Sequence, residues 1–220
     1  MNAEQFSGVA AQLREPSGEA ANKIAEAMEK SNAFIMARAH ELLQVKAGET
    51  IIEIGPGSGE LSKPLVSALG PKGGYVGLEM SEKMAAAARE NLQASSAAAV
   101  EIIHGDCQQA ELQLGRADGL TAVNLVYFID DLPGLLAKIH SWLGPDGRLT
   151  LGIRSPTVMR AMPFEDHGFV IRPLDEILID LGRAGFHEIG LKYFDEGRAS
   201  FGELELAVDS VIIHATKTAG

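Results

Sequence analysis

The stretch Thr50–Gly59 reads T-I-I-E-I-G-P-G-S-G and decides the fold of this 220-residue chain. Its first half, Thr50–Ile54, is short, β-branched and apolar with one acid, which suits a buried strand of a parallel sheet. Three glycines follow at alternate positions, Gly55, Gly57 and Gly59. Glycines at such a turn let the backbone bend tightly and let a ligand approach it closely.

A helix is predicted after the glycine turn, because Leu61, Leu65, Val66 and Leu69 recur at helical spacing. Strand, glycine turn and helix together predict the start of a nucleotide-binding βα unit. The dinucleotide fingerprint G-x-G-x-x-G requires a third glycine where this chain has Glu60. A carboxylate at the start of the helix would also repel a pyrophosphate, so the turn disfavours NAD.

The pattern E-x-G-x-G-x-G, which begins at Glu53, resembles motif I of the class I S-adenosylmethionine (SAM) methyltransferases. SAM carries a sulfonium and an ammonium but no phosphate, so an acidic, open turn suits SAM better than NAD. A carboxylate inside an apolar strand is costly unless it is paired. The resemblance implies that Glu53 helps to hold the turn and the ammonium end of SAM. It also implies that the turn itself binds the cofactor through Gly55, Gly57, Ser58 and Gly59.

The rest of the chain alternates between strand and helix patterns. Strands are predicted at 75–80, 98–104, within 118–128 and at 148–153, and helices at 81–92, 132–143 and 174–184. Residues 1–18 are polar, 19–45 predict one or two helices, and 154–173 are expected to be irregular. Two late strands, at 186–194 and 204–216, are predicted to form a hairpin that turns at 195–198.

Such alternation implies a parallel sheet with helices on both faces. The predicted fold class is α/β: three αβα layers, doubly wound, around a mostly parallel seven-stranded sheet whose last strand is antiparallel. This is the Rossmann-like pattern of the class I methyltransferases. The prediction is one globular domain overall, with residues 1–47 as a helical lid and residues 48–220 as the SAM-binding part.

Further cofactor ligands are expected where strands end, because open α/β sheets bind ligands at those ends. Glu79 ends the second strand, and the resemblance implies that it accepts hydrogen bonds from the SAM ribose. It likewise implies that Asp106 accepts the adenine amino hydrogen while the backbone N–H of Cys107 bonds the ring. Met80 and Met84 are predicted to flank the adenine.

Asn124 lies where the fourth strand should end and could bond the SAM ammonium through its carbonyl. The plainer alternatives stay open: Glu79 as a surface acid, Asp106 as a helix cap, Met84 as core, and Asn124 as an amide bonded to backbone.

Methyl transfer from a sulfonium is an in-line displacement, and positioning alone can supply much of its acceleration. The family has no universal catalytic residue, so the candidate catalytic residues, Tyr127 and His167, rest on their positions after the fourth and fifth predicted strands. A solvated loop histidine is the plainer interpretation of His167. Other candidate substrate contacts lie in the predicted lid and after these strands: Phe6, Phe128, Asp130, Arg154, Arg160 and Arg172.

Composition limits the other classes of function. A formal net charge of −11 argues against nucleic acid as a partner. Cys107 is the only cysteine, which excludes an internal disulfide, and the six histidines lack metal-ligand spacing. No signal peptide or membrane-spanning run is found, so a cytoplasmic protein is expected. A homodimer is left open.

The predicted function is transfer of a methyl group from SAM to an O, N, S or C atom of a small molecule, in the manner of the ubiquinone- and menaquinone-pathway methyltransferases that the chain resembles. Two alternatives come from other classes of protein. One is an NAD(P)-dependent oxidoreductase, although this chain lacks the third glycine of the dinucleotide fingerprint. The other is a non-catalytic protein with the SAM-binding fold.

Overall fold

The computed structural model describes residues 3–18, 21–112, 116–162, 167–201 and 204–218. The strands are β1 (Thr50–Ile54), β2 (Gly74–Glu79), β3 (Ala99–His104), β4 (Ala117–Val123), β5 (Leu143–Arg154), β6 (Phe186–Phe201) and β7 (Leu204–Lys217). The α-helices are α1 (Ala3–Arg14), α2 (Ala21–Leu43), α3 (Lys63–Leu69), α4 (Glu82–Ser95), α5 (Leu132–Trp142), α6 (Pro156–Ala161) and α7 (Leu174–Arg183). Two short 3-10 helices are η1 (Glu60–Ser62) and η2 (Val126–Phe128).

These strands form one seven-stranded sheet in the order β3-β2-β1-β4-β5-β7-β6. Pairs from β3 to β5 are parallel, whereas β7 is antiparallel to both β5 and β6. The order reverses between β1 and β4, where the chain crosses from one half of the sheet to the other. The predicted fold class is therefore confirmed, including the antiparallel last strand.

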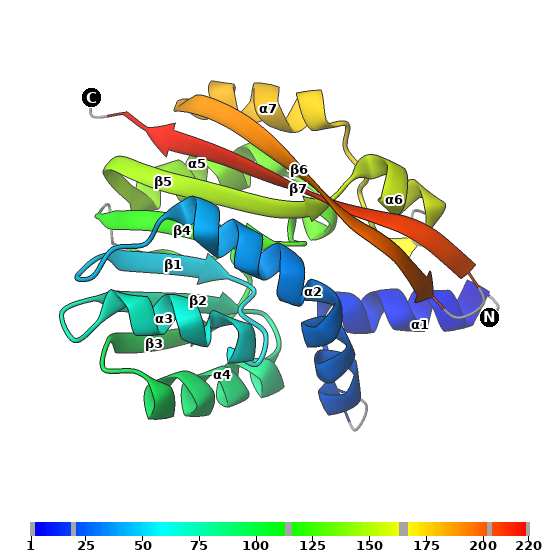
Figure 1. The fold of residues 1–220 in the computed structure, drawn as a ribbon, viewed down its shortest axis with the longest axis horizontal. Helices are drawn as coiled ribbons and strands as arrows, with labels where there is room; N and C mark the ends of the chain where they lie inside the picture. Colours follow the sequence, from blue (N-terminus) through cyan, green and yellow to red (C-terminus); the bar gives the residue numbers. More distant parts are fainter. Residues whose placement is uncertain (1–2, 19–20, 113–115, 163–166, 202–203, 219–220) are drawn as a thin grey trace.

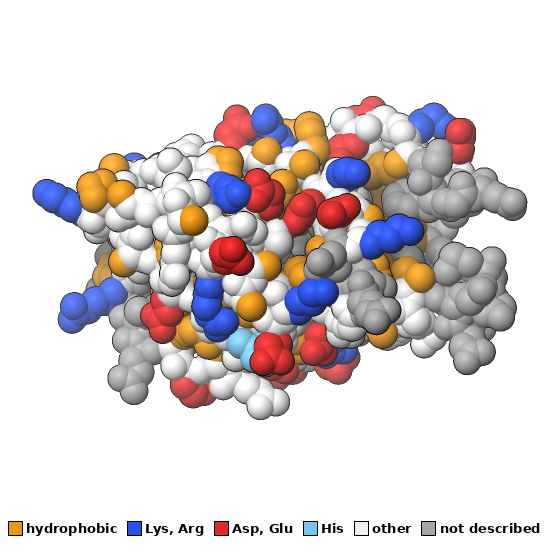
Figure 2. Space-filling view, turned by 90° about the horizontal axis from the view of Figure 1, so that it is seen from below, with side chains coloured by type: hydrophobic (Ala, Val, Ile, Leu, Met, Phe, Trp, Pro, Cys, Tyr) orange, Lys and Arg blue, Asp and Glu red, His pale blue; other side chains and the backbone are white. Residues whose placement is uncertain are grey.

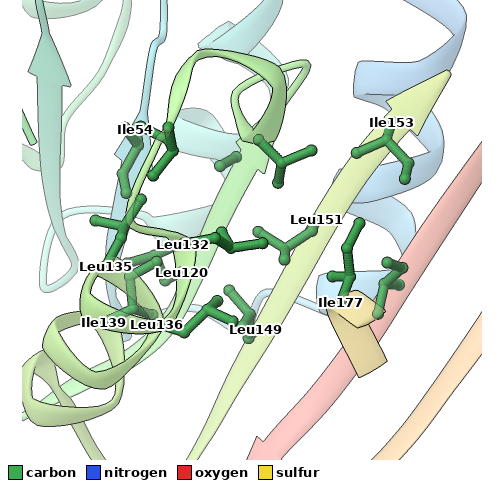
Figure 3. Packing of buried hydrophobic residues seen from close by; sticks show 14 of the residues in the cluster. Ile54, Leu120, Leu132, Leu135, Leu136, Ile139, Leu149, Leu151, Ile153 and Ile177 are labelled. Carbon is green, nitrogen blue, oxygen red and sulfur yellow. The ribbon is translucent and has the colours of Figure 1, made fainter. Parts of the chain in front are cut away.

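Helices cover both faces of the sheet (Figure 1): α2, α3 and α4 lie on one face, and α5 and α7 lie on the other. The larger core lies under α5 and α7. Figure 3 shows Leu120 of β4 and Leu149 and Leu151 of β5 close to Leu136 and Ile139 of α5. Along β4 and β5 these residues alternate with residues that face α2. Each of these two strands therefore contributes side chains to the apolar layers on both faces of the sheet.

Three local predictions from the sequence are wrong. Residues 1–18, described as polar within the predicted helical lid, contain α1, whose Ala10 is buried in the main core. The segment 154–173, expected to be irregular, contains α6, and the Ser155 hydroxyl caps it by accepting from the Val158 N–H at 3.2 Å. Short or largely polar helices such as these have too few apolar repeats for periodicity to reveal them.

The other two errors concern where strands begin and end. Residues 195–198 are a bulge within β6 and not the hairpin turn, because pairing with β7 shifts register there and resumes as far as Phe201. Gly197 accommodates the bulge with φ of 78°. Likewise β5 begins at Leu143, before the strand predicted at 148–153, and its pairing with β4 shifts register between Leu143 and Arg148.

All the parallel strands end at one edge of the sheet. There α1, the N-terminal half of α2, and α6 gather around the strand ends (Figure 1). Ser81 fixes the start of α4 beside the end of β2, because its hydroxyl accepts from the Met84 N–H at 3.3 Å. This edge is where polar strand-end residues come together.

Candidate functional site

A cavity of about 590 Å³ opens at the carboxyl edge of the parallel strands. Its walls come from the turn after β1, the end of β2, residues 105–108, the segment after β4, α6, and the two N-terminal helices. The predicted site residues that line it are Gly55, Gly57, Ser58, Glu79, Met80, Met84, Asp106, Cys107, Asn124, Tyr127, Phe128 and Arg154.

The glycine turn forms the floor of this cavity. Gly55 and Gly57 have φ of 76° and 59°, in the left-handed region, and open space lies where a Cβ would stand. Gly59 differs, because a Cβ there would lie 2.9 Å from the Leu92 side chain and 3.2 Å from the Ala88 backbone of α4. Gly59 is buried outside the cavity lining, so it serves helix packing and we no longer assign it to the cofactor.

Glu79 projects into the cavity beside the turn. One carboxylate oxygen accepts from the Gly57 N–H and the other from the Ser81 N–H, both at 2.9 Å. Burial raises the pKa of Glu79, although the backbone N–H donors oppose that rise. An ionised carboxylate has about four acceptor positions, so it retains capacity for two further donors.

Glu53 does not line the cavity, contrary to its expected contact with the ammonium end of the ligand. Its carboxylate accepts from the Tyr75 hydroxyl at 2.6 Å and lies 3.4 Å from His40 Nε2. Burial alone would raise its pKa, but His40, Tyr75 and Ser62 outweigh that effect and hold the pKa of Glu53 below its usual range. Glu53 therefore fastens β1 to β2 and α2 beneath the turn.

Asp106 and Cys107 line the cavity after β3. One Asp106 oxygen accepts from the Gln108 N–H at 2.8 Å, the bond that a capping role predicts. Burial raises the pKa of the Cys107 thiol to about 12, so this side chain is a neutral wall. Met80 and Met84 lie on the same part of the lining.

Asn124 contains the least satisfied polar group of the site. Its backbone has φ of 53°, and its side-chain N–H donates to Asn32 Oδ1 of α2 at 3.0 Å. The other amide atom, Asn124 Oδ1, is buried and has no hydrogen-bond partner among the described residues. A buried carbonyl oxygen without a partner is costly, so this position favours a ligand that brings a donor.

Tyr127 and Arg154, two residues expected to contact the substrate, line the cavity but already have hydrogen-bond partners within the protein. The Tyr127 hydroxyl donates to the Arg154 backbone carbonyl at 3.0 Å, and burial raises its pKa far above the usual range. Arg154 is itself committed: its guanidinium pairs with Glu196 and donates to Ser210 Oγ at 2.8 Å and to the Ser31 carbonyl at 2.7 Å. Neither side chain is available as a base or as an anion site.

Three other predicted substrate residues lie outside the cavity lining: Asp130, Arg160 and Arg172. Arg172 donates to the carbonyls of Val126, Ile129 and Asp130 at 2.7–3.0 Å, so it holds the segment after β4 in place. Asp130 and Arg160 are exposed. The side chain of Phe6 lies outside the described part of the structure.

His167 lines a second, smaller cavity of about 210 Å³, which shares Arg14, Phe128 and Phe169 with the first. The histidine is thus near the main cavity but is not part of its lining. Among the described residues, no three His, Cys, Asp or Glu side chains gather as metal ligands would.

Sequence reasoning missed the contribution of α2. Met28, Glu29, Asn32 and Met36 of this helix all line the cavity, and the Ser58 hydroxyl of the turn donates to Glu29. The sequence predicted one or two helices over 19–45 within the lid, but it did not indicate which of their residues line the cavity. Nothing local to Glu29 or Asn32 marks either as a site residue, because their roles depend on contacts with segments far along the chain.

The donors and acceptors present fit the groups that SAM would bring. Glu79, Asp106 and Asn124 offer acceptor oxygens, which suit hydroxyl, amino and ammonium donors. The turn at Gly55 and Gly57 leaves room for close approach. Open glycines, spare carboxylate capacity and a buried oxygen without a partner thus fit SAM on structural grounds.

Comparisons with known proteins agree with this geometry. Residues 51–147 match the methyltransferase domain family. The chain is 28% identical over 111 residues to nocamycin O-methyltransferase of Saccharothrix syringae, covering 50% of this chain and 40% of that protein. It is 24% identical over 135 residues to demethylmenaquinone methyltransferase of Listeria welshimeri, covering 58% of this chain and 57% of that protein. The chain spans about half the length of these curated relatives.

Among solved structures, a SAM-dependent methyltransferase from Aquifex aeolicus superposes with a TM-score of 0.67 at 15% identity, covering 88% of this chain and 97% of that one. This likeness concerns the fold, and the matched domain spans β1 to β5 with the glycine turn. Residues 51–147 thus match a methyltransferase domain, and the chain shares the fold of a solved SAM-dependent methyltransferase, which supports the resemblance that the pattern beginning at Glu53 indicated.

Proposed function

We propose that this chain transfers a methyl group from SAM to an O, N, S or C atom of a small-molecule acceptor. The observation that carries the proposal is the convergence of the glycine turn, Glu79, Asp106 and the unpartnered Asn124 oxygen on one cavity. These groups come from the ends of β1, β2, β3 and β4, where an open α/β sheet binds its ligand.

Each end of the cofactor has residues that would hold it. Glu79 would accept from the ribose, Asp106 and the Cys107 N–H would bind the adenine, and Met80 and Met84 would flank it. Asn124 Oδ1 would accept from the ammonium group. When bound, the cofactor supplies a methyl group on a positively charged sulfur.

The protein's own contribution to the reaction would be positioning and exclusion of water. The helices α1 and α2 line the cavity opposite the strand ends, which supports their proposed role as a lid. Tyr127 has a raised pKa and a hydroxyl that donates to backbone, so we assign it to the wall and not to proton transfer. His167 remains a candidate base only if an acceptor extends toward the smaller cavity.

Calorimetry tests the proposal directly. SAM or S-adenosylhomocysteine should bind with roughly micromolar affinity, about −8 kcal/mol, while NAD should not. NAD binding without SAM binding would favour the oxidoreductase alternative. SAM binding without transfer of labelled methyl to any of a broad set of acceptors would favour the non-catalytic one.

A small-molecule acceptor is also consistent with the charge of the surface. The net charge is −11, and on the face shown in Figure 2 Lys and Arg side chains lie among Asp and Glu. Within the described residues, no helix has both the length and the apolar character needed to cross a bilayer. Cytoplasmic location and homodimer formation remain predictions.

A further inference from the structure

The cavity contains an unusual concentration of one residue type. All six methionines in the described part of the chain line it. They come from three places that are distant in sequence: Met28 and Met36 from α2, Met80 and Met84 at the start of α4, and Met159 and Met162 at α6. Methionine is flexible and polarisable, so it adapts to irregular apolar ligands and makes favourable contacts with aromatic rings.

Two of these methionines, Met159 and Met162, belong to the same apolar cluster as three aromatic side chains that line the cavity. Phe128 and Phe169 lie edge to face with ring centroids 4.7 Å apart, and Tyr127 is 6.1 Å from Phe169. Met159 and Met162 line the cavity with these rings. The segments that carry this wall follow β4 and β5, beyond the residues that fit the cofactor.

The cationic groups in the lining are already paired or lie on exposed positions. Arg154 is buried and committed to Glu196, Ser210 and a backbone carbonyl. The other cations in the lining, Arg14 and Lys23, belong to exposed positions of α1 and α2. A charged acceptor would have to lose its water without a committed counter-charge, which is costly.

We infer that the methyl acceptor is an uncharged molecule with an aromatic, largely apolar body, held against the wall formed by Tyr127, Phe128, Phe169, Met159 and Met162. This inference rests on the proposed function and narrows it to one substrate class. Because methionines form much of the cavity, the site accommodates several ring shapes, and apolar area, not a fixed polar contact, sets the affinity.

The test titrates probes into protein saturated with S-adenosylhomocysteine, whose own binding is measured first. A series of 4-alkylphenols should gain about three- to four-fold in affinity for each added methylene until the chain fills the cavity. Neutral 1-naphthol should bind at least about ten-fold more tightly than 1-naphthoate or 1-naphthylmethylammonium, because the charged probes lose water without a partner.

A matched pair of variants places the probe in the cavity. Val9 lines the cavity from α1 and is 38% exposed, whereas Ile179 lies on α7, does not line the cavity and is 52% exposed. Because both side chains reach solvent, Val9→Lys and Ile179→Lys should both fold. Val9→Lys should weaken naphthol binding about five- to ten-fold, and Ile179→Lys should leave it unchanged.

The outcomes separate the two levels of the proposal. Tight cofactor binding with no gain along the alkyl series, or with preference for a charged naphthalene, overturns the apolar acceptor and leaves the methyltransferase proposal standing. Equal effects of Val9→Lys and Ile179→Lys also overturn it, because the probe would then bind elsewhere. Absence of cofactor binding removes the proposed function and this inference with it.

Discussion

Glu53 and Glu79 lie near the ends of adjacent parallel strands, on the same side of the sheet, yet their surroundings differ. Glu53 is 1% exposed and bonded to other side chains, whereas Glu79 is 5% exposed, bonded to backbone N–H groups and part of the cavity lining. The register pairs Glu53 with Gly77. Glu79 therefore extends one pleat farther, level with the turn at Gly55, where no side chain stands between it and the cavity.

A difference of one pleat thus separates an acid that supports the turn from an acid that faces the ligand. Tyr75 and His40 interact with the Glu53 carboxylate inside the protein, so these contacts stabilise the folded state and do not bind a ligand. Backbone donors occupy only part of the Glu79 carboxylate, so the remainder is available for binding. The comparison predicts that substitutions at the two positions affect different measurements.

The largest expected effect is that of Glu53→Ala on stability. The change leaves the buried Tyr75 hydroxyl without an acceptor and His40 without its carboxylate, so the free energy of unfolding should fall by about 2–4 kcal/mol. Urea denaturation measures this loss of stability, provided that the dependence of the unfolding free energy on urea concentration has the same slope in the parent and the variant.

The folded fraction of this variant should bind S-adenosylhomocysteine within about two-fold of the parent, because Glu53 does not line the cavity. A loss of affinity equal to that of a Glu79 variant, with stability unchanged, would show that Glu53 reaches the ligand and would remove the contrast.

The next effect is that of Glu79→Ala on binding. Loss of hydrogen bonds to a charged acceptor should weaken S-adenosylhomocysteine binding by about 1–3 kcal/mol, measured by calorimetry. Glu53→Gln is the matched control, since it removes a neighbouring strand-end charge without touching the cavity. Unchanged affinity in Glu79→Ala would take this residue out of the cofactor site.

The comparison also explains how far the sequence could lead. The fold was predictable because β1, its glycine turn and the alternation that follows are local patterns, and the strand ends located Glu79, Asp106 and Asn124. Glu53 was harder to interpret, because a motif gives the position of an acid but not its partners. Tyr75 and His40 lie 22 and 13 residues away from it in the sequence.

The acceptor end was least predictable for the same reason. Arg154 and Arg172 were candidate substrate contacts, but in the fold Arg154 pairs with Glu196 and Arg172 donates to three backbone carbonyls. Whether a charge is available depends on tertiary contacts that no local pattern records. The methionine lining was likewise hidden, since each methionine read singly fits an ordinary apolar position.

A smaller effect is expected from Tyr75→Phe, which removes one donor to Glu53 and leaves the ring packed. The free energy of unfolding should fall by about 1 kcal/mol, the net value of a typical hydrogen bond, and cofactor affinity should not change. Thermal or urea unfolding beside calorimetry measures both. A clear loss of affinity would mean that the support beneath the turn also sets the geometry of the cavity.

The smallest effects should appear in the pH dependence of stability, where the two glutamates have opposite signs. The pKa of Glu53 is lowered from an ordinary value of 4.5, so its stabilisation is complete above that pH and is lost as the pH falls through the lowered folded-state value. The pKa of Glu79 is raised from the same ordinary value, so the folded protein keeps its proton longer than the unfolded chain does. Its contribution to stability therefore declines as the pH rises from 4.5 through the raised value.

Urea denaturation of the parent, Glu53→Gln and Glu79→Gln between about pH 4 and pH 7 separates these contributions. The stability advantage of the parent over Glu53→Gln should shrink toward the acid end of the range. The difference between the parent and Glu79→Gln should move in the parent's favour there, because protonation relieves a buried charge. Parallel profiles for the two variants would mean that both carboxylates share one environment, contrary to the separation by one pleat.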